Sequence, residues 1–309
     1  MIINDLKKVA LIALAGAAMT FTSCKDDDPL PPIGGYNGSD EIAKADLVAY
    51  WPLNGSGTES ISNTAPNKSA ANSFEDGIKG QGLKLDSGYL SYPAISALES
   101  ISGAITISAW AKISNTKSAP GATSTISPIF SLSNPNEQIG NVSIFGNTHE
   151  LVTSDSIQMK AEYRVKKDDG SSFGGDCVSL IKLSQGQIDE NNSGANPPNA
   201  AFPNKIGGKW AHVVYRYFVQ DGKTYNQLFV NGVKISNPKW EKRSDEAIPF
   251  NQFTPSYPII GALKTVVEGT NSDTWNAPLT GSVDEVRIYK KSLSDAEISA
   301  LYQLELAGR

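Results

Sequence analysis

The stretch ITISAWAKIS, residues 105–114, carries the pattern that decides the fold class of this chain. Ile105 and Ile107 alternate with Thr106 and Ser108, so that apolar residues recur at every second position. This period is typical of a β-strand that turns one face toward a core. The same alternation returns in GLKLDSGYLSYP (82–93), and KWAHVVYRYFV (209–219) and NQLFVNGVKIS (226–236) are further predicted strand segments.

Turn signals separate or interrupt these segments. Asp221-Gly222 lies between the last two of them, and Asn231-Gly232 lies inside the last one. Such pairs favour tight hairpins, because glycine accepts a positive φ. Many short strands joined by turns, with little helical periodicity elsewhere, predict an all-β sandwich or barrel.

One short helix is predicted near the C-terminal end. Ser294 and Glu297 have the spacing of a capping box, in which each side chain satisfies a free backbone N–H of the first turn. Leu293 and Ile298 flank that start and can pack together as a hydrophobic staple.

Composition narrows the classes of partner and of stabilisation. The net charge of the 309 residues is −5 and no basic stripe is visible, so nucleic acid is not an expected partner. The two cysteines, Cys24 and Cys177, are too few for a disulfide-stabilised secreted fold. We therefore expect Cys177 to be a buried thiol that packs as a small apolar side chain.

The N-terminal residues 1–23 read as a signal peptide. Lys7 and Lys8 precede a short apolar run, and small residues follow it before Cys24. The sequence FTSCKDDD resembles a bacterial lipoprotein signal, which implies cleavage before Cys24 and lipid attachment to its sulfur. The acidic residues that follow resemble the export tag of surface lipoproteins in polysaccharide-foraging Gram-negative bacteria, although a solvated acidic linker is the alternative.

Residues 24–42 are expected to form a flexible tether, because PLPPIGGYNGSD (29–40) is rich in Pro and Gly. Together with the resemblance to lipoproteins, this predicts a protein anchored to the outer membrane through its lipid alone and facing the cell exterior.

From residue 43 to 309 the chain resembles a laminin G-like domain of the concanavalin A-like lectin/glucanase superfamily. The resemblance rests on an ordered set of segments: LVAYWPLNGSG, KGQGLKLDSGYLSYP, ITISAWAKIS, GKWAHVVYRY, LFVNGVKI and GSVDEVRIYKKSLSDAEISALY. It implies a two-sheet antiparallel jelly-roll sandwich with one short C-terminal helix. The Ser/Thr-rich residues 114–127 and the residues 184–208, which lack periodicity, are predicted to form long loops. The resemblance does not fix the function, because the superfamily contains lectins, binding modules, glycosidases and structural domains.

Two adjacent acids, Asp284 and Glu285, are the first candidates for chemistry. Neighbours in a regular strand point to opposite faces, which would place Asp284 with the core residues and Glu285 with Arg287 on the outer face. A glycosidase needs two carboxyl groups on one cleft, and the E-x-D-x-x-E cluster of the superfamily's glucanases is absent. We therefore expect a protein without catalytic activity.

The resemblance also implies a structural Ca²⁺ near this strand. Asp284 would be one ligand, and Glu59 and Asn63 of the loop after the first strand would be the others, with Asn67 a further oxygen in that loop. The alternative is that Asp284 only accepts hydrogen bonds from loop N–H groups, since an unpaired buried charge would be very costly.

Two tryptophans lie in polar loops and are candidates for stacking on sugar rings. These are Trp240 and Trp275, and Asn271 and Asp273 beside the second could bind sugar hydroxyls. An alternative is that each indole only anchors its loop to a sheet edge. The other tryptophans, Trp51, Trp110 and Trp210, and also His212, lie in strand motifs and are expected to pack structurally.

These features predict a cell-surface lipoprotein that binds a carbohydrate or glycan without catalysis. One alternative is a structural or protein-binding component of an outer-membrane assembly, with the loop 184–208 as the interaction element. A second alternative is a glycoside hydrolase with an unrecognised site.

Overall fold

The computed structural model describes residues 30–114, 125–148, 157–179 and 206–309. The chain divides into two units, residues 1–31 and 32–309, and the description below concerns the second. The predictions for the signal peptide, for Cys24 and for most of the loops 114–127 and 184–208 lie outside the described residues. Among the residues that are described, no helix is long and apolar enough to cross a membrane.

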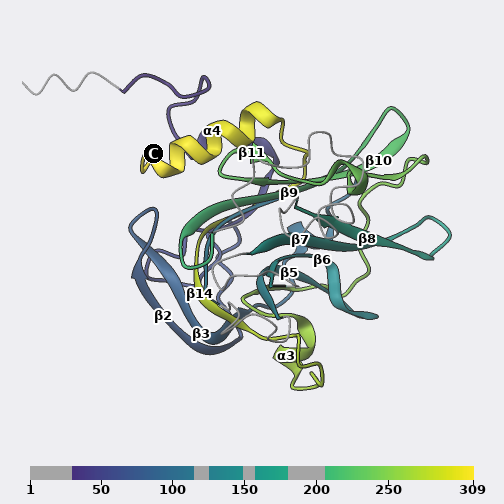
Figure 1. Cartoon of the computed structure of the whole chain (residues 1–309), viewed down its shortest axis with the longest axis horizontal. Coiled ribbons are helices and arrows are strands. Elements are labelled where there is room, and N and C mark those ends of the chain that lie inside the picture. Colours follow the sequence, from purple (N-terminus) through teal and green to yellow (C-terminus); the bar gives the residue numbers. More distant parts are fainter. Residues whose placement is uncertain (1–29, 115–124, 149–156, 180–205) are drawn as a thin grey trace, which may run out of the picture. The chain divides into compact units, whose positions relative to one another are not determined.

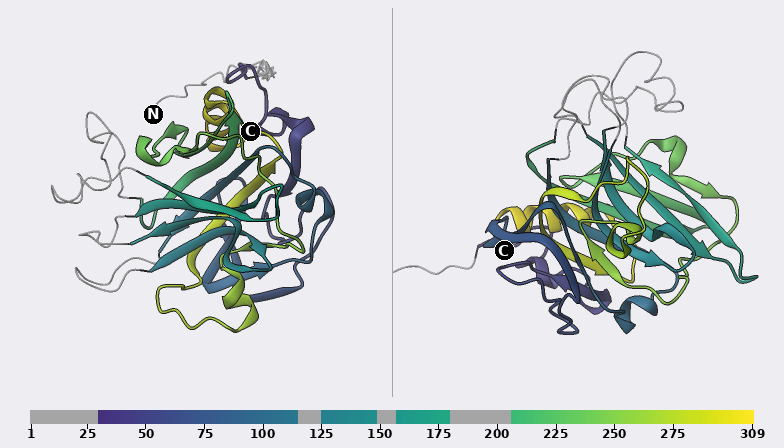
Figure 2. Two further views of the ribbon diagram at one scale, coloured as in Figure 1. Left: turned by 90° about the vertical axis from the view of Figure 1, so that its right-hand side faces the viewer. Right: turned by 90° about the horizontal axis from the view of Figure 1, so that it is seen from below.

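The described strands form two antiparallel layers (Figures 1 and 2). The first layer follows the order β11-β10-β9-β4-β14-β3, with β1, β2 and β12 paired alongside, and the second follows β13-β5-β6-β7-β8. The strands of the first layer are β1 (Leu47–Trp51), β2 (Lys68–Asp76), β3 (Gln81–Ser91), β4 (Ile105–Ile113), β9 (Trp210–Gln220), β10 (Lys223–Val230), β11 (Val233–Lys234), β12 (Lys242–Ser244) and β14 (Leu279–Tyr289). Those of the second are β5 (Ile126–Asn134), β6 (Glu137–Asn147), β7 (Gln158–Lys166), β8 (Ser172–Val178) and β13 (Pro258–Ile260).

One short strand joins the two layers through its backbone. Ile259 of β13 is the register partner of Ser91 in β3 and of Ser131 in β5, so hydrogen bonding continues from one layer into the other. The result is a curled antiparallel sheet folded into a sandwich, which confirms the predicted all-β jelly-roll class.

Aromatic side chains fill the space between the layers. Trp51 of β1 lies 5.8 Å from Phe130 of β5, and Tyr163 of β7 lies 4.9 Å from Tyr217 of β9, measured between ring centroids. Burying each such side chain contributes roughly 2–3 kcal/mol, so these contacts hold the layers together. The packing roles predicted for Trp51 and for the thiol of Cys177 are confirmed, since both are fully buried.

The two predicted hairpins are confirmed in their backbone conformation. Asp221 and Gly222 have φ of 50° and 72°, and Asn231 and Gly232 have φ of 52° and 76°. Positive φ at both central residues is typical of a type I′ turn, whose twist matches the right-handed twist of the flanking strands. These turns connect β9 to β10 and β10 to β11 in register.

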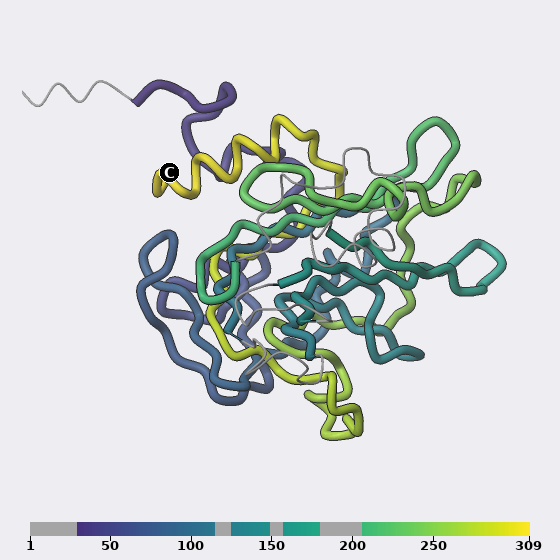
Figure 3. The backbone as a smooth tube through the Cα atoms, in the orientation of Figure 1, coloured from purple at the N-terminus to yellow at the C-terminus, as the bar shows by residue number. Residues whose placement is uncertain are grey.

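The C-terminal helix α4 (Asp295–Leu306) covers the outer face of the first layer, where Figure 3 follows the chain from β14 into it. Ser294 and Glu297 form the predicted capping box, with both reciprocal hydrogen bonds present. Ile298 and Leu301 pack on Val214 and Phe229 of the sheet. The other short helices are α1 (Ser96–Glu99), α3 (Lys264–Glu268), η1 (Ser39–Glu41), η2 (Lys44–Asp46) and η3 (Pro238–Trp240).

The C-terminal part of the predicted tether, residues 24–42, packs against the rest of the domain. Ile33, Tyr36 and Ile42 pack against the apolar cluster of α4, and the hydroxyl of Ser39 donates to the backbone oxygen of Arg309 at 2.7 Å. A Pro- and Gly-rich segment can become ordered where its few apolar side chains pack on an apolar surface, and α4 provides such a surface.

Candidate functional site

The two adjacent acids do not alternate across β14, which corrects the prediction for Asp284. Asp284 pairs with Trp110 and Arg287 pairs with Ser108, so β14 has one more residue between these pairs than β4 has. Glu285 is at the bulge, with φ of 50°. Because cross-strand partners share a face, Asp284 lies on the outer face with Trp110 rather than on the core face.

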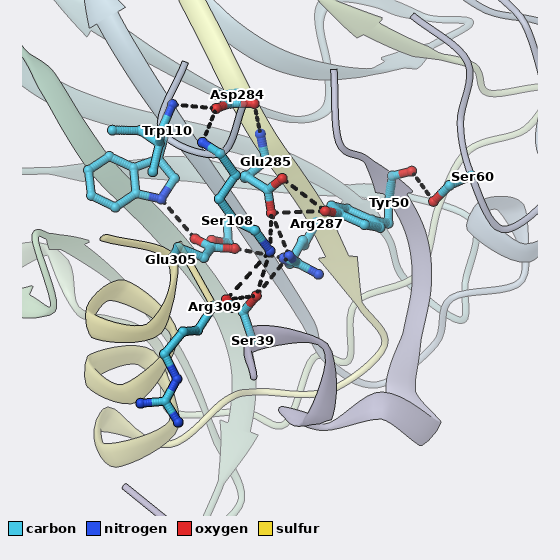
Figure 4. A network of polar contacts seen from close by, with 12 residues as sticks. Ser39, Tyr50, Ser60, Ser108, Trp110, Asp284, Glu285, Arg287, Glu305 and Arg309 are labelled. Carbon is cyan, nitrogen blue, oxygen red and sulfur yellow. Dashed lines mark hydrogen bonds and ion pairs between the residues drawn. The ribbon is translucent and has the colours of Figure 1, made fainter. Parts of the chain in front are cut away.

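Arg287 is the centre of a buried polar network beneath α4 (Figure 4). Its Nη2 donates to Glu285 at 2.6 Å, and its Nε donates to Glu305 at 2.7 Å. The guanidinium also lies 3.9 Å from the ring centroid of Tyr50, whose hydroxyl donates to Glu285 at 2.9 Å. Trp110 completes the network by donating from Nε1 to Glu305 at 2.8 Å.

The network shifts several protonation equilibria. Burial raises the pKa of Glu305 to about 7, although Arg287 works in the opposite direction. Burial, and then the charge of Arg287, lower the pKa of His212 to about 3, so this imidazole is neutral and its Nε2 lies 2.8 Å from the hydroxyl of Ser108. The expected structural role of His212 agrees with this complete burial.

The proposed calcium ligands are occupied by hydrogen-bond donors. The Oδ2 of Asp284 accepts from the backbone N–H of Ile78 at 2.7 Å and of Lys79 at 3.1 Å. Burial nevertheless raises the pKa of this carboxyl to about 7. These contacts agree with the alternative reading, in which Asp284 accepts loop N–H groups.

Glu59 is equally engaged, within its own loop. Its two oxygens accept from the N–H groups of Tyr50 at 2.7 Å, Ile61 at 2.9 Å and Ser62 at 2.6 Å, and also from the hydroxyl of Ser62. Asn63 is exposed with φ of 60°, a turn position, and Asn67 is also exposed. Carboxylates whose lone pairs already accept N–H groups do not fit as calcium ligands, and we derive no role for the metal here.

The two candidate tryptophans occupy different surroundings. Trp240 ends η3, where the guanidinium of Arg243 lies 5.3 Å and the Nζ of Lys239 lies 5.6 Å from its ring centroid. Trp275 instead packs on an apolar cluster formed by Ile126, Ile139, Phe145 and Leu263 on the outer face of the second layer. Trp275 also lines a hollow, together with Phe145.

Asn271 and Asp273 shape the loop that carries Trp275. Asn271 donates from Nδ2 to the backbone oxygen of Asn276 at 3.0 Å and accepts at Oδ1 from Asn276 Nδ2 at 3.0 Å. Asp273 accepts from Gln138 of β6 at 3.2 Å. The structure therefore brings these predicted residues beside Trp275, where their recorded contacts position the loop.

The hollow beside Trp275 has a volume of about 280 Å³ and is lined by Thr125, Ile126, Phe145, Asn147, Lys160, Glu162 and Trp275. We call it the Trp275 hollow. Two aromatic side chains and two charged ones thus meet at one open surface of β5, β6 and β7. An apolar wall with a few convergent polar groups is the usual composition of a small-ligand site.

Three charged side chains form one group on the polar side of this hollow. The Nζ of Lys160 lies 2.6 Å from Glu162 Oε1 and 3.1 Å from Asp176 Oδ2. Glu162 and Asp176 are direct register partners in β7 and β8, so both carboxylates stand on one face. Burial works against charge on Lys160, but the two carboxylates outweigh it and raise the pKa of the ammonium. The group offers one donor and two acceptors in a fixed arrangement.

The sequence analysis missed Lys160, Glu162 and Asp176. A signal for the first two was present, because QMKAEYRVK (158–166) alternates apolar and charged residues with a period of two. A strand that carries charges at every second position places them in a row on one face. The sequence of this strand does not show which loop packs beside its row of charged residues.

Part of the chain matches a known family model. Residues 152–299 match the model of a family described as the concanavalin A-like lectin/glucanases superfamily. No sequence among the curated proteins matches.

Several solved structures resemble the fold at low identity. A sialidase of Trypanosoma rangeli in complex with a difluoro sugar acid shares 15% identity with a TM-score of 0.48, over 84% of this chain and 33% of that one. The receptor-binding domain of a botulinum neurotoxin of mosaic serotype C/D shares 13% identity with a TM-score of 0.48, over 84% and 50%. A heptameric SAP-like pentraxin of Limulus polyphemus shares 12% identity with a TM-score of 0.38, over 68% and 79%.

This chain spans only about a third of the length of the sialidases that it resembles. The family match covers β7 to β14 and the beginning of α4, which include two strands of the outer face that carries the Trp275 hollow. The model of the concanavalin A-like lectin/glucanases superfamily thus matches just under half of this chain.

Proposed function

We propose that this chain is a cell-surface lipoprotein that binds carbohydrate without catalysis, and that the Trp275 hollow is its sugar-binding site. The superfamily whose model matches residues 152–299 includes lectins in its description, which supports the ligand class. The lipid anchor on Cys24 and the outer-membrane location come from the N-terminal sequence and are part of the same proposal.

The observation that carries the proposal is the meeting of Trp275 and Phe145 with Lys160 and Glu162 in one hollow. A sugar ring presents an apolar C–H face and a rim of hydroxyl groups. The half-buried indole can pack against the first, and the ammonium and the carboxylate can bind the second, while the phenyl ring is buried against the wall of the hollow. Asn147 adds a side-chain amide that can donate and accept.

The site is held in position before any ligand arrives. The backbone N–H of Ile126 donates to the carbonyl of Trp275 at 2.9 Å, and Asp273 is bonded to Gln138. A preformed site loses less conformational entropy on binding than a loop that must order itself.

Isothermal titration of a soluble form without Cys24 and its lipid, residues 25–309, against a panel of polysaccharides tests the proposal. We expect micromolar to millimolar binding to at least one polysaccharide and loss of that binding in Trp275→Ala. Absence of binding to every polysaccharide in the panel would overturn the proposal.

One observation favours a second candidate, a glycoside hydrolase. Glu162 and Asp176 contact the same ammonium, so their nearest oxygens lie at most about 6 Å apart, and the roughly 5–9.5 Å range of glycosidase carboxyl pairs begins below that limit. The position of Lys160 argues against a hydrolase. Both carboxylates accept from its ammonium, whereas the acid of a glycosidase must donate a proton to the leaving oxygen.

An assay for new reducing ends separates the two candidates. Turnover of a bound polysaccharide that disappears in Glu162→Gln and in Asp176→Asn would establish the hydrolase. Binding with no increase in reducing ends over a day supports the binding protein.

A further inference from the structure

Among the described residues, the charged side chains around the Trp275 hollow pair with one another, and their net charge is negative. The ammonium of Lys160 is bonded to both Glu162 and Asp176. Arg164 follows Glu162 by two residues in β7, and its Nε lies 2.7 Å from Glu137 Oε1. Within this group of described residues, each cation has a carboxylate partner and the three carboxylates outnumber the two cations.

Local packing keeps Arg164 away from the hollow. A Cβ at Gly174, its register partner in β8, would overlap the arginine side chain, so the missing side chain leaves room for it over β8. Its Nη1 donates to the carbonyl of Tyr163 at 2.8 Å, and its Nε pairs with Glu137. The guanidinium is therefore committed to its own strand and to β6.

An anionic ligand meets unfavourable electrostatics at such a surface. A carboxylate or sulfate bound to the third N–H of Lys160 would lie beside Glu162 and Asp176, which already accept from the same ammonium, so like charges would face each other. Asp176 is the more accessible of the two, with 33% of its side chain exposed against 12% for Glu162. An uncharged sugar avoids this conflict, because its hydroxyl groups can donate to both carboxylates without breaking the group.

We propose that the Trp275 hollow selects uncharged glycans and rejects polysaccharides that carry carboxylate or sulfate groups. This inference rests on the proposed function and adds the charge class of the ligand. It predicts that affinity for a neutral polymer exceeds that for its anionic counterpart by about tenfold or more.

A panel with matched charge states tests the inference. It contains neutral polymers (mannan, xyloglucan, mixed-linkage glucan, galactan), anionic ones (alginate, chondroitin sulfate) and polygalacturonate with its fully methylated ester. We expect binding to be confined to the neutral members of the panel. If either form of polygalacturonate binds, we expect it to be the uncharged methyl ester. Preferential binding of an anionic member overturns the inference and leaves carbohydrate binding intact, whereas silence across the panel overturns the proposed function itself.

A charge reversal provides the second arm of the test. Asp176→Lys should raise affinity for the anionic members by about tenfold at low salt, and the gain should shrink as salt is added. The matched control is Asp245→Lys, an equal change at an exposed aspartate that pairs with Lys223 and Lys242 at the end of β12. Equal gains in both variants, or no gain in Asp176→Lys, would contradict the inference. If circular dichroism shows that Asp176→Lys is unfolded, Asp176→Asn serves in its place, with a smaller gain expected.

Discussion

Trp275 and Ile126 are joined through their backbones, with the N–H of Ile126 donating to the carbonyl of Trp275 at 2.9 Å. This bond ties the loop that carries the indole to the first residue of β5. The indole then packs on Ile126 and Phe145, so backbone and side chain agree on its position. A binding surface built this way has a fixed wall, and five predictions follow for it and for the rest of the fold.

The first prediction concerns the aromatic wall. Trp275→Ala should weaken glycan binding at least tenfold by titration calorimetry, because it removes the larger of the two apolar surfaces in the hollow. Trp240→Ala is the matched control, since its indole lies between Arg243 and Lys239 on η3. Trp275→Phe should retain part of the affinity. Equal losses in both alanine variants would move the site away from the hollow.

The second prediction concerns the pH dependence introduced by Asp284. Its pKa is raised from 3.8 to about 7 by burial, so between these values the unfolded chain releases a proton that the folded protein keeps. This group therefore lowers the free energy of unfolding as pH rises from about 4 to 7. In Asp284→Asn that contribution is gone, and the variant should gain stability relative to the wild type over the same window, by on the order of 1 kcal/mol or more.

Urea denaturation at pH 4.5, 5.5, 6.5 and 7.5 measures this difference. The control is Asp245→Asn, since hydrogen bonding and charge from Lys242 lower the pKa of that exposed carboxyl. A stability difference for Asp284→Asn that stays constant across the series would refute the assigned protonation.

The third prediction concerns the buried arginine. Arg287→Met leaves Glu285 and Glu305 without their cation in a buried setting, where 1% or less of the Arg287 and Glu305 side chains is exposed. Removing one partner of such a network typically costs about 3–5 kcal/mol. Lys242→Met, which removes an exposed partner of Asp245, should cost less than about 1 kcal/mol. Chemical denaturation of both variants compares them, and similar costs would mean that burial does not set the strength of the network.

The fourth prediction concerns the start of α4. Ser294→Ala removes the side chain that accepts from the N–H of Glu297 and should lower stability by about 1 kcal/mol. Ser294→Gly should cost only a few tenths of that, because glycine at this position leaves the end of the helix open to water. Ser292→Ala, two residues earlier and outside the cap, should be neutral. Thermal unfolding of the three variants checks the order.

The fifth prediction concerns calcium. Because N–H donors occupy the carboxylates of Asp284 and Glu59, the melting temperature should agree within about 1 °C in EDTA and in millimolar CaCl₂. A calcium-dependent rise of several degrees would show that the loops rearrange to form the site that the family resemblance implies.

Much of the fold follows from local rules that the sequence obeys. The hairpins at Asp221-Gly222 and Asn231-Gly232 and the capping box at Ser294 each depend on a few adjacent residues, and all three are confirmed. The packing of Trp51 follows from strand periodicity in the same way. These features are local, so a single sequence contains the information that they need.

Features set by the partner strand were not predictable in this way. The bulge at Glu285 adds one residue to β14 against β4, and a count of alternation within one strand has no means of detecting it. The group of Lys160, Glu162 and Asp176 likewise depends on the register between β7 and β8. Charge alternation marks the face, but only the pairing brings the two acids to one ammonium.

The three residues of β13 give the sandwich a property that core packing alone would not. Because they hydrogen-bond to β3 on one side and to β5 on the other, opening the seam between the layers also breaks a backbone ladder. Ile259 and Ile260 are fully buried at that seam. The two layers should therefore unfold as a single cooperative unit, and the slowly exchanging amide protons of β3, β5 and β13 should report one common free energy of opening.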